Sequence, residues 1–158
     1  MRLSLTRIYH FSGSHRLHSP KLSDAANRDL FRECNNQGGH GHNFYLHVTV
    51  SGPVDPATGM IINLGVLDPL IQDVVLRKLD HRFYSAEYLR LSEAADHAEP
   101  WIATSENLVR LIHPWVAAAL PEGVELIRLR LDETASNRFE YSGKQPLLQA
   151  SEPMECAP

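Results

Sequence analysis

The sequence predicts one α+β domain built on an antiparallel sheet. Its expected elements run in the order strand, strand, helix, helix, strand, strand, a grouping that favours an antiparallel sheet over alternating parallel units. The chain has 158 residues, which suits one domain with its own core, and it contains no internal repeat or interdomain linker. We therefore expect a single domain over residues 1–143, with four strands and two helices, and a mobile tail over residues 144–158.

The first strand is expected over residues 3–17, where apolar and polar residues alternate. The residues that share its apolar face are Leu3, Leu5, Tyr9 and Phe11. Residues 18–39 then bring the Gly, Pro and Asn residues that are typical of a loop. A short helix is expected inside this loop, capped by Ser23 or Asp24 and ending near Glu33.

The second strand begins near His42 and alternates more regularly than the first. The residues of its apolar face are Phe44, Leu46, Val48 and Val50. After the turn residues 55–59, apolar residues recur at helical spacing, and they are Leu64, Leu67, Ile71, Val74, Val75 and Leu79. Asn63 is one candidate cap for this helix, and Asp68 is the other because Pro69 fits more easily in a first turn.

The second half of the chain predicts a helix followed by two strands. Residues 82–103 are irregular and partly acidic, and the helix opens at Thr104 with an acid in its first turn. Its buried stripe consists of Leu108, Leu111, Ile112, Trp115, Val116 and Ala119, and Pro114 is expected to kink it. The last strands are expected over residues 124–133 and 137–142.

Three histidines form a candidate metal site. His40 and His42 are two residues apart, so in a strand they point to the same face. His15 has the parity of the apolar face of the first strand, whereas His10 and His47 have the opposite parity. If the first two strands pair antiparallel, three imidazoles converge and leave a fourth position open, as in catalytic zinc sites. The alternative is that they are ordinary polar residues near a strand end.

Four further residues are candidates for acid–base or binding chemistry. Cys34 lies six residues before His40, and a thiolate near a metal can act as a general base, although an inert buried cysteine is the alternative. Asp80 next to His81 is the arrangement of a proton relay, or simply a helix end. Glu133 ends an apolar strand face, where a carboxylate either binds hydrogen-bond donors or is exposed.

Composition excludes several classes of function. The formal net charge is −4, and Lys and Arg are scattered, so we expect no nucleic-acid partner. No apolar run is long enough for a membrane span, and the first residues lack a signal-peptide core, so we expect a cytoplasmic protein. The two cysteines are Cys34 and Cys156, and we expect Cys34 to be a free thiol.

These residues together resemble the 6-pyruvoyl-tetrahydropterin synthase family. The similar stretches are residues 11–17 (FSGSHRL), 34–43 (CNNQGGHGHN), 55–60 (DPATGM), 79–81 (LDH), 104–107 (TSEN) and 133–134 (ET). The resemblance extends over most of residues 5–143, although Gly13 stands where relatives often have Ala.

The resemblance implies the tunnelling fold, or T-fold, with the order β-β-α-α-β-β. In this fold subunits close an antiparallel barrel as trimers, and two trimers form a homohexamer. It further implies that His15, His40 and His42 bind Zn²⁺, and that Cys34, Asp80 and His81 are catalytic. The residues implied in binding the pterin ring are Glu133, Thr104, Ser105 and Glu106. Arg16 is a candidate for contacting phosphate.

The implied activity is a lyase reaction that converts 7,8-dihydroneopterin triphosphate to 6-pyruvoyl-tetrahydropterin and releases triphosphate. The alternative within the family is 6-carboxytetrahydropterin synthase of queuosine biosynthesis, which also releases acetaldehyde. The five-residue spacer from Asn35 to Gly39 favours the pyruvoyl enzyme. An alternative of another class is a non-catalytic, zinc-stabilised binding module, with Cys34 as the fourth ligand.

Overall fold

The structure is a computed structural model that describes residues 2–85, 88 and 101–143. Its strands are β1 (Arg2–His15), β2 (His40–Pro53), β3 (Arg82–Tyr84), β4 (Glu125–Asp132) and β5 (Arg138–Tyr141). Its helical segments are α1 (Asp24–Phe31), the 3₁₀ turn η1 (Arg32–Asn35), α2 (Leu64–Ile71), the π-helical η2 (Gln72–Leu76), α3 (Arg77–Leu79) and α5 (Ser105–Ala119). The expected tail, residues 144–158, lies outside the described residues.

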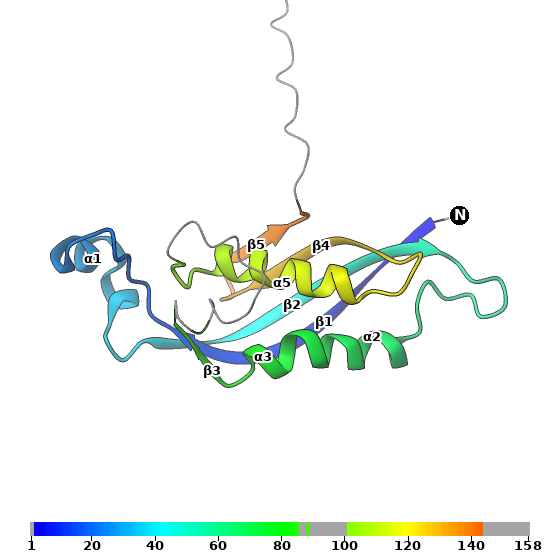
Figure 1. Ribbon diagram of the computed structural model, residues 1–158, viewed down its shortest axis with the longest axis horizontal. Helices are drawn as coiled ribbons and strands as arrows, with labels where there is room; N and C mark the ends of the chain where they lie inside the picture. The colour runs from blue at the N-terminus through cyan, green and yellow to red at the C-terminus, as the bar shows by residue number, and fades with distance from the viewer. Residues whose placement is uncertain (1, 86–87, 89–100, 144–158) are drawn as a thin grey trace, which may run out of the picture.

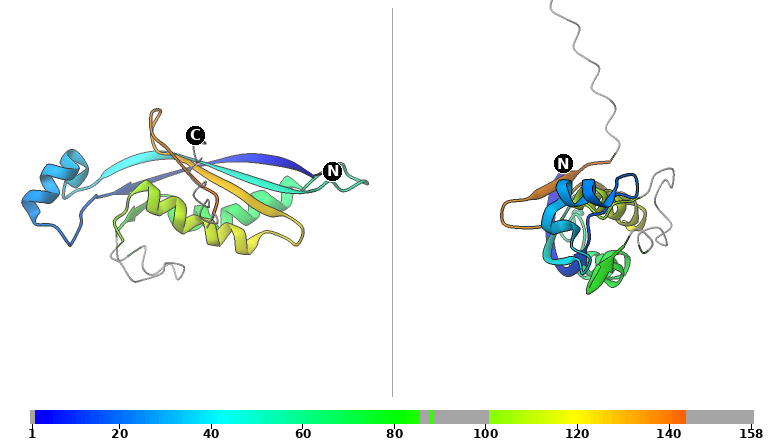
Figure 2. Two further views of the ribbon diagram at one scale, coloured as in Figure 1. Left: turned by 90° about the horizontal axis from the view of Figure 1, so that it is seen from above. Right: turned by 90° about the vertical axis from the view of Figure 1, so that its left-hand side faces the viewer.

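The strands form one sheet in the order β3-β1-β2-β4-β5, and the long helices lie on the same face of it (Figures 1 and 2). The expectation of four antiparallel strands is therefore wrong in one detail. The fifth strand, β3, pairs parallel with residues Gly13–His15 of β1. With three residues, β3 is too short to produce the alternation by which a strand is recognised in a sequence.

The long β1–β2 ribbon confirms the expected pairing and faces. The two strands pair antiparallel over their whole length, and His15 lies opposite His40. On β2, all four residues of the expected apolar face are fully buried. They pack with Phe11 of β1 and with the buried residues of α2 and α5 to form the core between sheet and helices.

α2, η2 and α3 form a continuous helical stretch beneath this ribbon. The Asn63 side chain caps its start by accepting a hydrogen bond from the Gly65 N–H, at 2.8 Å. The alternative start at Asp68 is wrong, since the Asp68 carboxylate instead accepts hydrogen bonds from Arg7 and Tyr9 of β1. These bonds join the helix to the sheet.

A β-bulge in β4 changes the expected face of one residue. Between Thr49 and Val50 the register of β2 against β4 skips Ile127, whose side chain is 43% exposed. Regular alternation would place Ile127 on the buried face of Leu129, two residues further along, but an extra residue in a strand reverses the side-chain alternation.

Gly13 of β1 is in close contact with Tyr84 of β3. A Cβ atom at Gly13 would lie 1.9 Å from the Tyr84 hydroxyl oxygen. Tyr84 is buried, and its hydroxyl donates a hydrogen bond of 2.7 Å to the Leu79 carbonyl, so the ring has little room to move. The absence of a side chain at Gly13 thus admits the Tyr84 ring against the sheet.

We expect Gly13→Ala to lower the free energy of unfolding by about 1–3 kcal/mol, since an added methyl group overpacks this contact. Thermal or urea unfolding measures the effect. Gly38→Ala is the matched control, because a Cβ atom there would meet nothing within 4 Å. Equal stability of the two variants would contradict the close contact between Gly13 and Tyr84.

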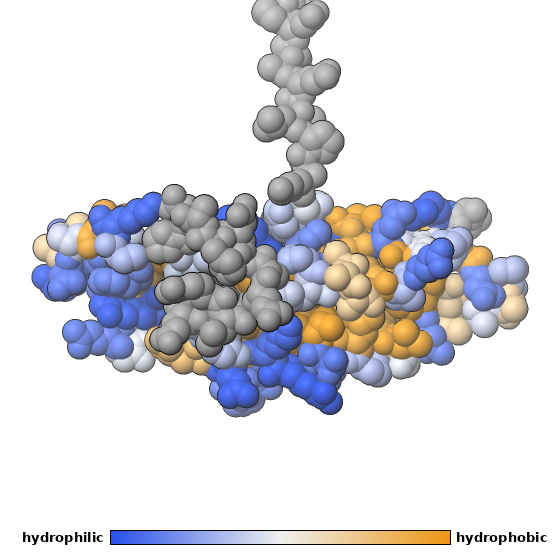
Figure 3. All heavy atoms as spheres, viewed as in Figure 1, coloured by the Kyte–Doolittle hydropathy of each residue, from blue (hydrophilic) through white to orange (hydrophobic). Residues whose placement is uncertain are grey.

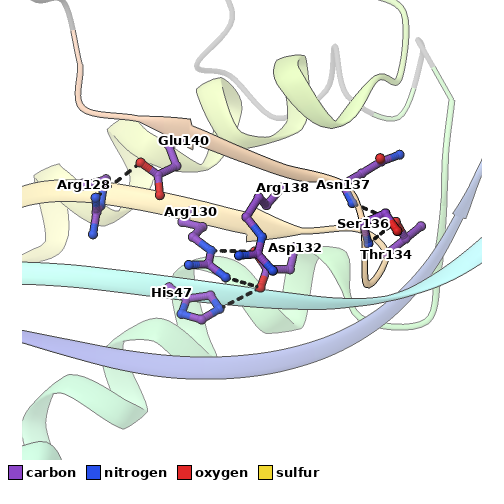
Figure 4. Close-up of polar contacts among 9 residues, drawn as sticks. All are labelled: His47, Arg128, Arg130, Asp132, Thr134, Ser136, Asn137, Arg138 and Glu140. Atoms are coloured by element: carbon purple, nitrogen blue, oxygen red, sulfur yellow. Dashed lines mark hydrogen bonds and ion pairs between the residues drawn. The ribbon is translucent and has the colours of Figure 1, made fainter.

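A network of polar side chains lies on the face of the sheet opposite the helices (Figure 4). Asp132 accepts two hydrogen bonds from Arg130, at 2.7 and 2.8 Å, and lies 3.2 Å from His47 Nε2. The Arg130 guanidinium is the main cause of a lowered pKa of Asp132, and His47 contributes. The structure therefore favours the ionised carboxylate.

The lowered pKa of Asp132 predicts a pH-dependent loss of stability. Ionised Asp132 stabilises the folded state above its unfolded pKa of about 3.9, and this is lost as pH falls through the lower, folded-state pKa. Asp132→Asn should therefore be less stable than the parent at pH 7, and the difference should shrink below about pH 4. Unfolding curves over this pH range measure it, and a constant difference would contradict the assignment.

Among the described residues, no helix is long and apolar enough to cross a membrane.

Candidate metal centre

Three imidazoles converge at one end of the β1–β2 ribbon. His15 is the last residue of β1 and His40 the first of β2, and His42 lies two residues further on the same face. One ring nitrogen of each lies within 4.8 Å of the other two, and the Nε2 atoms of His15 and His40 are 3.1 Å apart. Strand parity and antiparallel register therefore produce the cluster that the sequence predicts.

The hydrogen bonds of these rings leave nitrogen atoms available for a metal. His15 Nδ1 lies 2.6 Å from the Ala103 carbonyl, which can only accept, so Nδ1 carries the proton and Nε2 has a free lone pair. His42 Nε2 is buried and has no hydrogen-bond partner, and the nitrogen of His40 that faces His15 is Nε2. Unpartnered buried nitrogens are costly, and a metal ion is one partner that removes the cost.

Electrostatics favours the neutral rings that metals bind. Burial is the main cause of a lowered pKa at His15, and the neighbouring His40 and His42 lower it further. Burial also lowers the pKa of His40, again with a contribution from His42. Both rings are thus held in the form that ligates a metal.

Glu133 lies beside the three imidazoles. Its Oε1 atom is 3.8 Å from His15 Nε2 and 3.9 Å from His42 Nε2. Ser105, which is buried at the start of α5, donates a hydrogen bond of 2.6 Å to the same oxygen. The carboxylate follows β4 directly and is mostly buried, so it is oriented toward the centre of the site.

Two hydrogen bonds join the loop that carries Cys34 to Leu17, two residues after the end of β1. The Cys34 carbonyl accepts a hydrogen bond of 2.8 Å from the Leu17 N–H, and the Asn35 side chain donates one of 2.6 Å to the Leu17 carbonyl. Burial raises the pKa of the half-buried Cys34 thiol, and the negative charges of Glu133 and Glu33 raise it further.

Asp80 and His81 form a hydrogen-bonded pair at the end of α3. His81 Nδ1 lies 2.9 Å from Asp80 Oδ1, which also accepts from the Ser12 N–H. His81 has a φ of 56°, uncommon for a residue with a side chain, and its side chain is 81% exposed. The described residues include no hydrogen bond or ion pair between His81 and Cys34.

The remaining residues expected at the site, Thr104 and Glu106, lie at the start of α5. The Thr104 hydroxyl caps α5 by accepting from the Asn107 N–H, and Glu106 is an exposed acid in the first turn. Sequence reasoning missed the Ala103 carbonyl, since a backbone acceptor leaves no signal in the residue type. It also gave no role to Asn35, although this asparagine follows Cys34 directly.

An antiparallel sheet with helices on one face, and with three converging imidazoles beside a carboxylate, defines a T-fold protein with a candidate metal centre. The sequence model of the family "6-pyruvoyl tetrahydropterin synthase" matches residues 4–144, and the chain belongs to this family. The expected family and fold are thereby confirmed.

Named relatives agree with this assignment. A 6-pyruvoyl tetrahydrobiopterin synthase of Drosophila melanogaster is 38% identical over 143 residues, which cover 90% of this chain and 81% of the relative. The Homo sapiens protein of the same name is 37% identical over 140 residues, 89% and 91% of the two chains. The solved structure of Caenorhabditis elegans 6-pyruvoyl tetrahydropterin synthase has a TM-score of 0.76 and 34% identity, covering 91% of this chain and 97% of that one.

Proposed function

We propose that this chain is a zinc-dependent lyase that converts 7,8-dihydroneopterin triphosphate to 6-pyruvoyl-tetrahydropterin with release of triphosphate. The observation that carries the proposal is the convergence of three imidazoles beside the Glu133 carboxylate, in a member of this family. The relatives named above bear the name of the pyruvoyl enzyme, which supports this product over the carboxy alternative.

The residues present fit a zinc ion. Nitrogen donors 3.1 Å apart can both reach an ion at about 2.0 Å, and three imidazoles leave a fourth position for substrate. The Ala103 carbonyl would orient His15, as the outer partners of metal-binding histidines do. When bound, zinc would supply Lewis acidity to the hydroxyl groups of the substrate side chain.

Glu133 is suited to hold the pterin ring. Its Oε1 accepts from Ser105, and the carboxylate has further lone pairs for the adjacent N–H and NH₂ groups of an aminopyrimidinone. The bidentate geometry would fix the ring so that its side chain extends toward the three histidines. We assign Thr104 and Glu106 to the border of this site because they flank Ser105.

Cys34 is proposed as the base that removes a proton from the substrate side chain, and His81 as the acid that returns one. A cation held by the imidazoles would lower the pKa of the Cys34 thiol, opposing the effect of Glu133 and Glu33. Asp80 would orient the His81 ring through their 2.9 Å contact. Because His81 is exposed, we infer that it acts on the site of a neighbouring subunit.

The proposed activity is tested by incubating the zinc-loaded protein with 7,8-dihydroneopterin triphosphate. We expect mass analysis to give 6-pyruvoyl-tetrahydropterin and inorganic triphosphate. Release of acetaldehyde would indicate the carboxy enzyme instead. No conversion, combined with unfolding when zinc is removed, would indicate the non-catalytic zinc module.

We also propose that one domain, residues 1–143, forms the hexamer of the T-fold and is cytoplasmic. In the described part of the chain, β3 pairs only with residues 13–15 of β1 and Ser12 bonds to Asp80 and His81, so residues 2–11 have no strand on this edge. Apolar side chains gather on the face over α2 and α5 (Figure 3). Leu64 and Val66 of α2 are exposed. Both features are suited to burial between subunits.

Light scattering during size-exclusion chromatography should give six times the mass of the 17.8 kDa chain. The mass of a single chain at micromolar concentration would contradict the proposed assembly.

A further inference from the structure

A basic pocket includes residues that directly follow, in the sequence, two residues of the candidate site. Its volume is about 400 Å³, and it is lined by Arg16, His18, Asp24, Arg28, Arg32, Asn35, Asn36 and Gln37. Arg16 directly follows the histidine that ends β1, and Asn35 directly follows Cys34. α1 and η1, which supply half of the lining residues, lie beyond the end of the β1–β2 ribbon where this histidine is placed (Figure 2). The pocket therefore includes the residues that directly follow His15 and Cys34 in the sequence.

Arg16 is held in a fixed position within the pocket. Its Nε atom donates a hydrogen bond of 2.9 Å to the Asn35 carbonyl, and one Nη atom donates one of 3.3 Å to the Asn35 side-chain oxygen. Asn35 is itself buried and bonded to the Leu17 carbonyl. The other Nη group of Arg16 has no hydrogen-bond partner in the described part of the chain, so Arg16 can donate to a ligand without reorganisation.

Arg28 and Arg32 add positive charge to the pocket. Neither forms an ion pair with a described residue, and Asp24 is the sole carboxylate among the lining residues. Arg32 also adopts a φ of 47° and a ψ of −124°, a backbone conformation that favours glycine. A residue with a long cationic side chain therefore occupies a backbone conformation in which glycine is favoured.

We propose that Arg16, Arg28 and Arg32 form a polyphosphate subsite that binds the triphosphate chain of the substrate. Three guanidinium groups around a hollow suit a chain of phosphate groups, because guanidinium offers forked donors that match phosphate oxygens. The substrate would extend from the metal centre past Arg16 to Arg28 and Arg32. This inference rests on the proposed function, which it deepens by assigning phosphate recognition to residues outside the metal centre.

The test uses the double variant Arg28→Gln/Arg32→Gly, which keeps Arg16. We expect its KM for 7,8-dihydroneopterin triphosphate to rise roughly tenfold, as two exposed charge-assisted contacts of about threefold each combine. kcat and the affinity for unphosphorylated 7,8-dihydroneopterin should be unchanged. Inorganic triphosphate should inhibit the variant roughly tenfold more weakly, and its inhibition should depend less on salt.

Two comparisons separate charge from damage to the fold. Arg32→Gly alone should unfold at a higher temperature than the parent, since glycine adopts this φ without strain, while it still binds inorganic triphosphate more weakly. Arg110→Gln removes an exposed arginine of α5 that does not line the pocket, and it should match the parent.

The outcomes distinguish this inference from the proposed function. If the parent converts the substrate and the double variant has the same KM and the same inhibition by inorganic triphosphate, the subsite is wrong and the lyase assignment stands. If the parent does not convert the substrate but binds inorganic triphosphate through Arg28 and Arg32, the subsite stands and the lyase assignment fails.

Discussion

Replacing His42 with alanine should remove the metal and lower kcat/KM on the order of a thousandfold, because a Lewis-acid metal contributes several kcal/mol to such a reaction. His42 Nε2 is a buried nitrogen without a hydrogen-bond partner, so its loss deprives the site of a donor but breaks no hydrogen bond of that atom. We therefore expect the variant to remain folded. Metal content by mass spectrometry and turnover of 7,8-dihydroneopterin triphosphate measure the effect.

His47→Ala is the matched control for His42→Ala. His47 lies on the same strand but on the opposite face, where it contacts Asp132 (Figure 4). This variant should keep the metal and the activity. If the His42 variant bound zinc as tightly as the parent and retained full activity, the three-histidine site would be refuted.

Cys34→Ala should lower kcat by about 10²–10⁴-fold, the usual contribution of a general base. Metal content should stay unchanged, because the proposed ligands are the three imidazoles. The Cys34 side chain is only partly buried, and its backbone carbonyl still accepts from Leu17 in the variant, so the loop should keep its conformation. Single-turnover kinetics with the metal-loaded protein measures the effect.

Cobalt substitution separates a base from a metal ligand. A thiolate charge-transfer band in the resting protein, lost in Cys34→Ala together with cobalt affinity, would make Cys34 a fourth ligand and overturn its role as base. Replacing the other cysteine, Cys156→Ala, provides the matched control and should leave kcat as in the parent.

The cluster of three histidines could be predicted because strand parity is a local property. His40 and His42 lie two residues apart and the apolar face of β2 is unbroken, so side-chain direction follows from the sequence. The antiparallel register places His15 opposite His40, so it brings the His15 ring next to the other two imidazoles. Each step depends on neighbours along the chain or on a single strand pair.

Other features could not be predicted because they depend on contacts between distant segments. β3 is a strand only because three residues meet the end of β1, and Ile127 turns outward because a bulge in β4 depends on the facing strand. The Ala103 carbonyl reaches His15 across 88 positions in the chain.

The hydrogen bond between His15 and Ala103 has a consequence for the proposed metal site. The acceptor is a main-chain carbonyl just before the N-terminus of α5, so no side-chain substitution at that position removes it. The packing of α5 therefore sets the tautomer of His15, and we expect binding of the proposed ion to be thermodynamically linked to the docking of that helix. Amide hydrogen exchange in the first turn of α5 should slow on zinc loading, and more weakly in a His15→Ala variant.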